Sequence, residues 1–254
     1  MSWEAVEWTI VGPALVAGIL VLSTHVPLGQ VVLKRGIIFI DLAIAQVAGL
    51  GVIAASTFEW NESPLMVQAS AVGAALLAAA GLNWSEKRWP QTQEALIGTL
   101  FVLAATCSIL LLSENPHGGE HLKDLLVGQI LWTTWNMLVI IGVLYAVLLT
   151  LWFGARKKLG QIGFYIIFAF VVTASVQVVG VYLVFASLIL PALATRRLEG
   201  SRRLWAGYAI GVLSYFAGIV VSSILDLPTG AVIVWAMALT AVIAGTWIGR
   251  KKMA

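Results

Sequence analysis

One acidic residue lies inside the apolar stretches of this chain. Asp41 stands near the start of the stretch 37–56, and Gln46 follows on the same stretch. An ionised side chain inside a membrane costs about 2.5–3.5 kcal/mol on insertion scales, so it normally faces a partner or a water-filled path. We therefore predict that Asp41 lies on a path for a cation. The alternative is an interfacial carboxylate paired with Arg35 or with a neighbouring helix end.

Gln46 adds an amide to this stretch. It follows Asp41 by five positions, which is about 140° around a helix. The two side chains would therefore not chelate one ion on a straight helix, whereas across the axis of a homodimer they would line one path. An amide is a poor ligand for a transition metal, and a carboxylate is a good one.

A second group of polar residues matches the sequence motif of a metal site. His117, Glu120 and His121 match H-x-x-E-H, a zinc-hydrolase pattern. That pattern requires a helix to bring its ligands onto one face, and the paired glycines inside it predict a loop, so hydrolysis is not expected. Neutral imidazole and carboxylate suit zinc. We predict that these residues capture a divalent cation on the outer side or contact a delivering protein; the alternative is a solvated polar loop.

Several kinds of chemistry have no candidate residues. None of the seven Lys residues follows a Gly, so the phosphate loop G-x-x-x-x-G-K-[ST] is absent and any ATPase must be another polypeptide. The single cysteine, Cys107, lies in an apolar run and predicts neither a disulfide framework nor a thiolate metal cage. For His25 we predict a satisfied packing role. An intramembrane enzyme would need a helical catalytic constellation, for which only Asp41 qualifies, and no permanently bound cofactor is expected.

Composition places these residues in a membrane. The chain is 60% hydrophobic and 11% charged, against about 45–50% and about 25% in soluble domains. A helix crosses the hydrocarbon core in about 20 apolar residues. The clear candidates are 9–28, 37–56, 64–82, 95–112, 133–153, 204–224 and 229–248. Residues 163–195 would make one helix of about 50 Å, so we predict two short helices that meet near Gly180.

The basic residues predict the orientation. Of the 15 Lys and Arg residues, all but Lys123 fall in five short clusters between apolar stretches. The clusters are Lys34-Arg35, Lys87-Arg88, Arg156–Lys158, Arg196-Arg197 with Arg202-Arg203, and Arg250–Lys252. Short loops rich in Lys and Arg stay on the cytoplasmic side. We predict an all-α, polytopic membrane protein with eight to nine transmembrane helices, its N-terminus outside and its C-terminus cytoplasmic, forming a single transmembrane domain over residues 1–254.

Two local patterns complete this picture. Residues 1–8 carry Glu4 and Glu7 and no Lys or Arg, which is wrong for a cleavable signal peptide, so the first apolar stretch is expected to be a retained membrane helix. Gly207 and Gly211 form a G-x-x-x-G step of the kind that permits close helix packing.

Four stretches together resemble the permease subunits of bacterial ABC importers for zinc, manganese and iron, the ABC-3 family. They are LGQVVLKRGIIFIDLAIAQVAGLGV (28–52), DLLVGQIL (124–131), SVQVVGVYLVFASLILPALATRRL (175–198) and LDLPTGAVIV (225–234). The first is similar to the family's LG-x-x-x-x-x-R segment and the helix after it. The third is similar to Q-x-V-G-x-L-L-V-x-A-L-L-I-x-P-A-A-T-A. The resemblance spans residues 10–248.

The resemblance implies a membrane-spanning permease of an ATP-driven importer for a divalent transition metal, with zinc as the leading choice. It implies a homodimer in the bacterial cytoplasmic (inner) membrane, two copies of an ATP-binding subunit and an external, periplasmic or extracytoplasmic, metal-binding protein. The alternatives are the same scaffold importing manganese, iron or a metal chelate, or an ATP-independent channel or secondary carrier. Nucleic acid is not an expected partner, because the basic residues lie beside apolar segments.

The chain also departs from the family. The family usually has Gly-Asp-x-x-x-His in its second helix, and those Asp and His side chains are its expected metal contacts. Aligned through Gly51, this chain has Leu42 at the Asp position and Gln46 at the His position, with Asp41 one residue earlier. The family's acidic segment before its sixth helix is reduced here to Gly154–Gly160.

The site residues that follow from the motifs and the resemblance form three sets. The transport path comprises Asp41, Gln46 and Gln177; the metal ligands are Asp41, His117, Glu120 and His121; and the ATPase-coupling loop comprises Thr195, Arg196, Arg197, Leu198, Glu199 and Gly200. For the basic loop, a purely topogenic role is the alternative.

Overall fold

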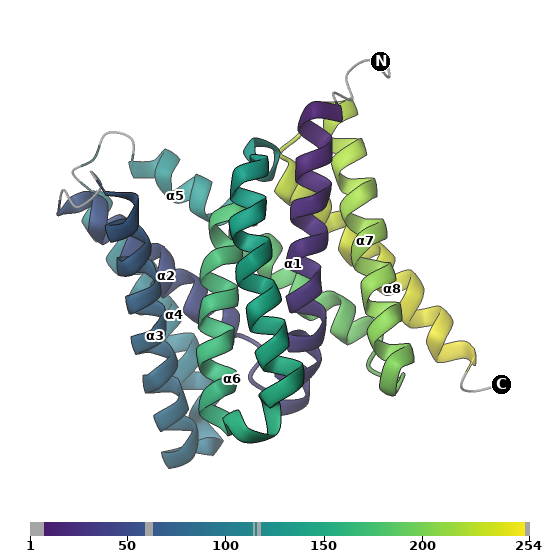
Figure 1. Cartoon of the computed structure of the whole chain (residues 1–254), viewed down its shortest axis with the longest axis horizontal. Coiled ribbons are helices and arrows are strands. Elements are labelled where there is room, and N and C mark those ends of the chain that lie inside the picture. Colours follow the sequence, from purple (N-terminus) through teal and green to yellow (C-terminus); the bar gives the residue numbers. More distant parts are fainter. Residues whose placement is uncertain (1–7, 59–62, 114, 116–117, 252–254) are drawn as a thin grey trace. The chain divides into compact units, whose positions relative to one another are not determined.

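The computed structural model describes residues 8–58, 63–113, 115 and 118–251, and helices dominate these ranges (Figure 1). The helices are α1 (Trp8–Arg35), α2 (Ile40–Thr57), α3 (Pro64–Arg88), α4 (Gln93–Leu112), α5 (Gly118–Val127), α6 (Trp135–Ala194), α7 (Gly200–Leu225) and α8 (Thr229–Lys251), with short 3-10 turns at Pro90–Thr92 and Ile130–Trp132. Eight helical segments in the described residues are long and apolar enough to cross a membrane. The all-α, polytopic prediction is confirmed.

The chain divides into two compact units, each assembled from separate stretches. Unit 1 comprises Met1–Arg35, Val127–Tyr145 and Val178–Ala254, and unit 2 comprises Gly36–Leu126 and Ala146–Gln177. Both units therefore share α6, whose two ends belong to unit 1 and whose middle belongs to unit 2. The single permease domain over the whole chain stays a prediction.

In unit 1, α7 packs between α1 and α8. Gly207 and Gly211 of α7 face Val26 and Leu22 of α1, and a Cβ on Gly207 would lie 2.8 Å from a Val26 methyl carbon. The predicted packing role of this G-x-x-x-G step is therefore confirmed. Two turns further along α7, Gly218 packs directly on the backbone of α8.

These contacts also fix the directions of the helices in unit 1. α7 runs antiparallel to α1, because the later of its two glycines meets the earlier residue of α1. α7 and α8 form an antiparallel hairpin, in which Ser222 bonds Thr229 near the turn. α1 and α8 are thus parallel, and the Trp8 end of α1 and the Lys251 end of α8 lie at opposite ends of unit 1. Which end faces the cytoplasm stays a prediction.

The sequence predicts two short helices that meet near Gly180, whereas α6 is one continuous helix through these residues, with an irregular backbone at Gly180. Its 60 residues include Gly160 at φ 58° and Gly180 at φ 78°. Gly180 meets Gly128, itself at φ 74°, and a Cβ on either glycine would overlap the other's backbone. Only glycine combines this conformation with so close an approach. Residues 160–194 form one candidate membrane span of 35 residues. The described residues therefore contain eight candidate spans, the lower of the two numbers that the sequence predicted.

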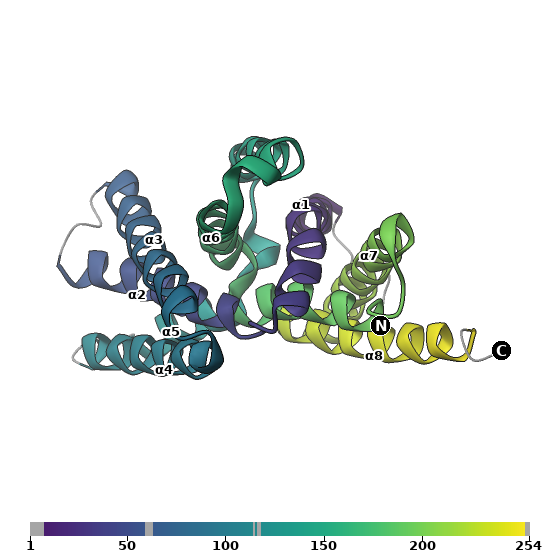
Figure 2. The same ribbon diagram turned by 90° about the horizontal axis from the view of Figure 1, so that it is seen from below.

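In unit 2, α2 packs against both α3 and α4. Figure 2 shows α3 and α4 on either side of α2. A Cβ on Gly51 would lie 2.7 Å from the carbonyl oxygen of Ser70, whose hydroxyl in turn donates to the Gly51 carbonyl at 2.7 Å. α2 and α4 begin at the same end of unit 2, because the Phe39 N–H donates to Glu94.

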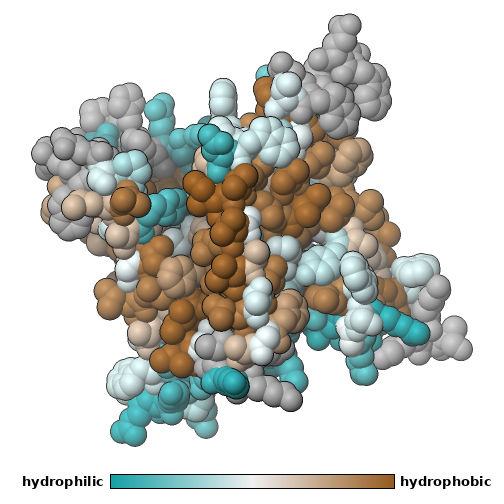
Figure 3. All heavy atoms as spheres, in the orientation of Figure 1, coloured by the Kyte–Doolittle hydropathy of each residue, from teal (hydrophilic) through white to brown (hydrophobic). Residues whose placement is uncertain are grey.

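The outward faces of the helices suit contact with lipid. Large apolar side chains are exposed along α4, α6 and α8, among them Leu103, Ile140 and Ile243. On the face drawn in Figure 3, apolar side chains cover the lengths of the helices and hydrophilic ones gather toward their ends. Trp84 and Trp89 are both exposed at one such end, with their rings edge to face at 5.1 Å, as expected for tryptophans at a membrane interface.

One sequence prediction about local structure is wrong. The segment around the H-x-x-E-H pattern is helical from Gly118 onward, not a loop. Gly118 packs closely on the end of α4, because a Cβ there would lie 2.6 Å from the Leu112 carbonyl oxygen. Leu125, two turns further along α5, packs against Gly49. Tertiary contacts on an amphipathic helix thus outweigh the low helix propensity of two glycines.

Candidate transport site

Asp41 lies in the first turn of α2, at the end of unit 2 where α4 also begins. Its side chain is fully buried, and neither carboxylate oxygen has a hydrogen-bond partner among the described residues. The backbone amides of Asp41 and Leu42 are the polar groups beside it. The positive end of the α2 dipole favours an acidic residue at this position. A buried carboxylate without a full set of donors is expensive, so it calls for a functional explanation.

Glu94 stands beside Asp41 and was missed by the sequence analysis. It lies in the first turn of α4, where its Oε1 accepts the Phe39 N–H at 3.2 Å and thereby covers the start of α2. Its Oε2 is buried and lacks a partner within the part of the chain that the structure describes. Glu94 and Asp41 interact electrostatically. The signal was present in the sequence, but Glu94 precedes the apolar stretch 95–112 by one residue and was counted as outside it.

Gln46 is almost completely buried on α2, with 5% of its surface exposed. Its position on the helix follows the sequence analysis, about 140° from Asp41. Its role on the transport path stays a prediction.

Gln177 is engaged with another amide. Its Nε2 donates to Gln68 Oε1 at 3.1 Å, and Gln68 Nε2 donates to Gln177 Oε1 at 2.6 Å. This reciprocal pair joins α6 to α3 within unit 2. The pair gives Gln177 a structural role, while its predicted place on the transport path stays a prediction.

A second polar cluster lies at the same end of unit 2 as Asp41. Glu86 Oε2 accepts hydrogen bonds from Gln161 Nε2 and from the Tyr165 hydroxyl, both at 2.6 Å. Gln93 extends the cluster, donating to the Tyr165 oxygen at 3.5 Å and accepting from Ser85 at 2.8 Å. These bonds tie α3, α4 and the middle of α6 together. The sequence analysis did not find this cluster, because its members are far apart in the chain.

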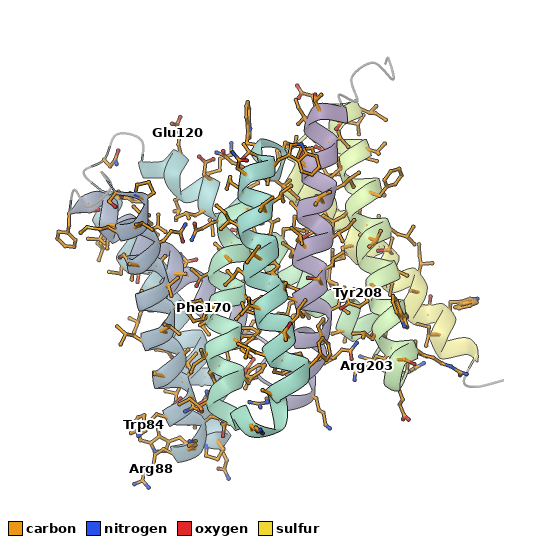
Figure 4. All side chains as sticks on the ribbon, viewed as in Figure 1. Trp84, Arg88, Glu120, Phe170, Arg203 and Tyr208 are labelled. Atoms are coloured by element: carbon orange, nitrogen blue, oxygen red, sulfur yellow. The ribbon has the colours of Figure 1, made fainter. Side chains whose placement is uncertain are left out.

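The predicted outer metal residues are only partly described. Glu120 is exposed in the first turn of α5 and projects outward (Figure 4). His117 lies outside the described residues, and the side chain of His121 does too. No group of three or more His, Cys, Asp or Glu side chains that could hold a metal ion occurs within the described ranges. The role of His117, Glu120 and His121 stays a prediction.

His25 is fully buried in α1. Its Nδ1 lies 2.8 Å from the Val21 carbonyl oxygen, so Nδ1 carries the proton. Its Nε2 has no partner among the residues that the structure describes. The predicted packing role therefore agrees with its burial, but only one of its two nitrogens is satisfied.

The basic loop lies between α6 and α7 in unit 1. Thr195 is buried, and its hydroxyl donates to the Pro191 carbonyl at 2.7 Å. Arg196, Arg197 and Glu199 are exposed, and Leu198 and Gly200 complete the predicted coupling loop. A cavity of about 420 Å³ adjoins the two arginines and is walled by apolar residues of α6 and α8. Figure 4 shows Arg203 at the start of α7 beside this loop.

The sequence matches the ABC 3 transport family over residues 7–165 and 154–247. A probable metal transport system membrane protein of Chlamydia trachomatis is 23% identical over 245 residues, which are 87% of this chain and 80% of that protein. The manganese transport system membrane protein MntC of Halalkalibacterium halodurans is 28% identical over 258 residues, 91% and 85% of the two chains. A probable iron transport system membrane protein of Haemophilus influenzae is 27% identical over 182 residues, 63% and 64%.

Among solved structures, PsaBC from Streptococcus pneumoniae in complex with Fab has the same fold. The TM-score is 0.77 at 18% identity, and the match covers 96% of this chain and 95% of that chain. At this identity the likeness establishes the fold alone.

The fold and the family match define a multi-pass membrane permease. The chain belongs to the ABC 3 transport family. It is the non-catalytic membrane component of a bacterial ABC importer, and so forms part of an ABC transporter complex. The alternative of an ATP-independent channel or secondary carrier is not supported by this family membership.

Proposed function

We propose that this permease imports a divalent transition-metal ion. The relatives named for metal, manganese and iron transport support this proposal. The observation that carries it is Asp41 in a predicted membrane helix of an ABC permease. Its carboxylate is fully buried and has no hydrogen-bond partner in the described ranges. Such a group can replace part of the water that a cation loses when it enters the membrane.

Zinc is the cargo favoured by the sequence, because His117 and His121 offer imidazole on the predicted outer side. Manganese and iron are the metals in the names of two relatives. Uptake assays with zinc and manganese in parallel decide between these metals.

The complex has two copies of this chain, two copies of an ATP-binding subunit and an extracytoplasmic metal-binding protein. Support for the ATPase contact comes from the loop Thr195–Gly200. Thr195 anchors it through Pro191, and the charged side chains that follow are exposed. Closure of the ATPase pair on ATP would then move the end of α6 and the start of α7, which this loop joins.

The test of the cargo is ATP-driven uptake in proteoliposomes that hold the permease with its ATPase. Asp41→Asn keeps the size of the side chain and removes its charge, so uptake should fall at least about tenfold, the loss expected for about 1.4 kcal/mol of lost ion stabilisation. ATP hydrolysis without metal should be unchanged. Gln46→Ala should reduce uptake less, because an amide offers only a dipole. Parental uptake by Asp41→Asn for both metals would disprove the assignment of Asp41 to the path.

The test of the ATPase contact is a triple variant of Arg196, Arg197 and Glu199 to Ala. It should insert normally but release the ATPase during purification and lose uptake. A matched control is Arg202→Ala with Arg203→Ala, which alters charge at the start of α7 and leaves the loop intact. If the triple variant retains the ATPase and transports normally, the loop is only a topogenic sequence.

A further inference from the structure

Three carboxylate oxygens at one end of unit 2 are buried and have no hydrogen-bond partner among the described residues. They are Oδ1 and Oδ2 of Asp41 and Oε2 of Glu94. Asp41 is fully buried, and Glu94 is half-buried. Because α2 and α4 both begin here, the two carboxylates share the positive ends of two helix dipoles.

The two side chains are held together by the backbone. Glu94 Oε1 accepts the N–H of Phe39, which precedes α2 and stands two residues before Asp41. This bond leaves Oε2 as the free oxygen of Glu94 and keeps it near Asp41, with which it interacts electrostatically. The arrangement thus offers two carboxylates from two helices, one of them fixed in orientation by its cap.

Two unpaired carboxylates in such a place repel one another. Each ion costs several kcal/mol to bury, and the repulsion adds to that cost. Helix dipoles offset only about 0.3–2 kcal/mol per group. A proton or a cation that joins the two carboxylates removes the repulsion. In a chain that belongs to an importer family, the transported cation is the natural occupant.

We propose that Glu94 is the second metal ligand of the Asp41 site, and that this site takes its cation through oxygen alone. The inference rests on the proposed function and extends it to the class of metal. Carboxylate and water ligands suit manganese and other hard ions, whereas imidazole and thiolate favour zinc. The site therefore points to manganese as the cargo. Two protein ligands also suit a transported ion, which must leave as readily as it enters.

The direct test is manganese binding to the purified full-length permease in lipid nanodiscs. Free aqueous Mn²⁺ is followed by its electron paramagnetic resonance signal, which falls on binding. Glu94→Gln keeps an oxygen that accepts the Phe39 N–H and removes the charge, so it isolates the role of the carboxylate. The affinity of Glu94→Gln for Mn²⁺ should fall at least about tenfold. Tenfold is the smallest typical loss in metal affinity when a residue that only supports a metal ligand is replaced, and loss of a ligand itself should cost at least as much. Asp124 is an exposed carboxylate on α5, and Asp124→Asn is the control. Its affinity for Mn²⁺ should lie within about twofold of the parent's, which corresponds to a difference in binding free energy of about 0.4 kcal/mol.

A second variant tests ligation separately from folding. Glu94→His places an imidazole at the same position, so the ratio of zinc affinity to manganese affinity should rise at least about tenfold if this side chain touches the ion. An unchanged ratio, or parental Mn²⁺ affinity in Glu94→Gln, would overturn the inference. If Asp41→Asn loses uptake while Glu94→Gln binds and transports normally, the proposed function stands and the role of Glu94 fails. If both variants transport normally, both fail.

Discussion

Two groups of buried and half-buried polar side chains lie at the same end of unit 2, and they differ in whether their carboxylate oxygens have hydrogen-bond partners. Around Glu86, carboxylate, amide and hydroxyl groups satisfy one another through Gln161, Tyr165 and Gln93. At Asp41 and Glu94, three carboxylate oxygens have no hydrogen-bond partner within the described part of the chain. The first cluster joins three helices. The second joins two helices through the Phe39 N–H and leaves those three buried oxygens without compensating donors in the described residues.

This difference in hydrogen bonding indicates a structural role for the Glu86 cluster and a transport role for Asp41 and Glu94. A satisfied cluster contributes to stability and specifies the packing of its helices, because every member would be costly to leave alone. An unsatisfied pair of carboxylates lowers stability and is expected only where a ligand compensates for it. The same residue type thus has opposite consequences in neighbouring places, and carboxylate-to-amide substitutions should reveal this.

The largest effect is expected from matched substitutions in the two clusters. Asp41→Asn removes an unpaired buried charge and should raise the melting temperature of the apo permease. Glu86→Gln turns two charge-assisted hydrogen bonds into neutral ones and should lower stability by about 1 kcal/mol. Tryptophan fluorescence during thermal unfolding in detergent measures both shifts.

Uptake should respond in the opposite sense. Asp41→Asn should lose transport, and Glu86→Gln should keep it in proportion to the folded protein. Tyr165→Phe serves as the control for the paired cluster, because it removes the hydroxyl but no charge. The comparison breaks down if Asp41→Asn lowers the melting temperature as much as Glu86→Gln does, since Asp41 would then have partners that hold the fold.

The sequence predicted the fold far better than the site. Long apolar stretches follow from the thickness of a bilayer, which any helix must match. The carboxylate of Asp41 was found because a charge inside an apolar run is conspicuous. Glu94 and the Glu86 cluster were missed because their roles depend on which helices pack together. Helix pairing cannot be predicted from each apolar stretch taken alone. The helix α5 was missed because propensity cannot show that Gly118 packs on Leu112.

Gln68 and Gln177 form a second hydrogen-bonded pair, at which the structural role of paired polar groups can be tested. Their reciprocal hydrogen bonds predict a structural role, so a double-mutant cycle with Ala should give a coupling energy of about 0.6 kcal/mol, typical of polar pairs between membrane helices. Thermal unfolding of the parent, both single variants and the double variant gives this value. Uptake should change little in each. If Gln177→Ala abolishes uptake and Gln68→Ala does not, Gln177 lies on the transport path.

The smallest effect is expected from the predicted outer residues, of which Glu120 is exposed. Glu120 projects from the start of α5, and we predict that it acts with His117 and His121 in capturing metal before entry. A hydrated ligand group gains little binding free energy when a metal ion replaces its water. Such a group would therefore act mainly by raising the local concentration of the metal ion. Replacing all three by Ala should raise the half-saturating metal concentration a few-fold and largely spare the maximal rate.

Acidification separates this role from a general effect of charge. At about pH 5.5 imidazole is protonated and no longer binds metal, so the parent should approach the triple variant in its concentration dependence. Lys123→Ala with Asp124→Asn, on the same helix, is the control and should match the parent at neutral pH. Because capture limits the rate only when metal is scarce, zinc and manganese uptake must be measured well below saturation. If the triple variant equals the parent there, these three residues do not bind the cargo, and Asp41 is the one metal ligand left from the predicted set.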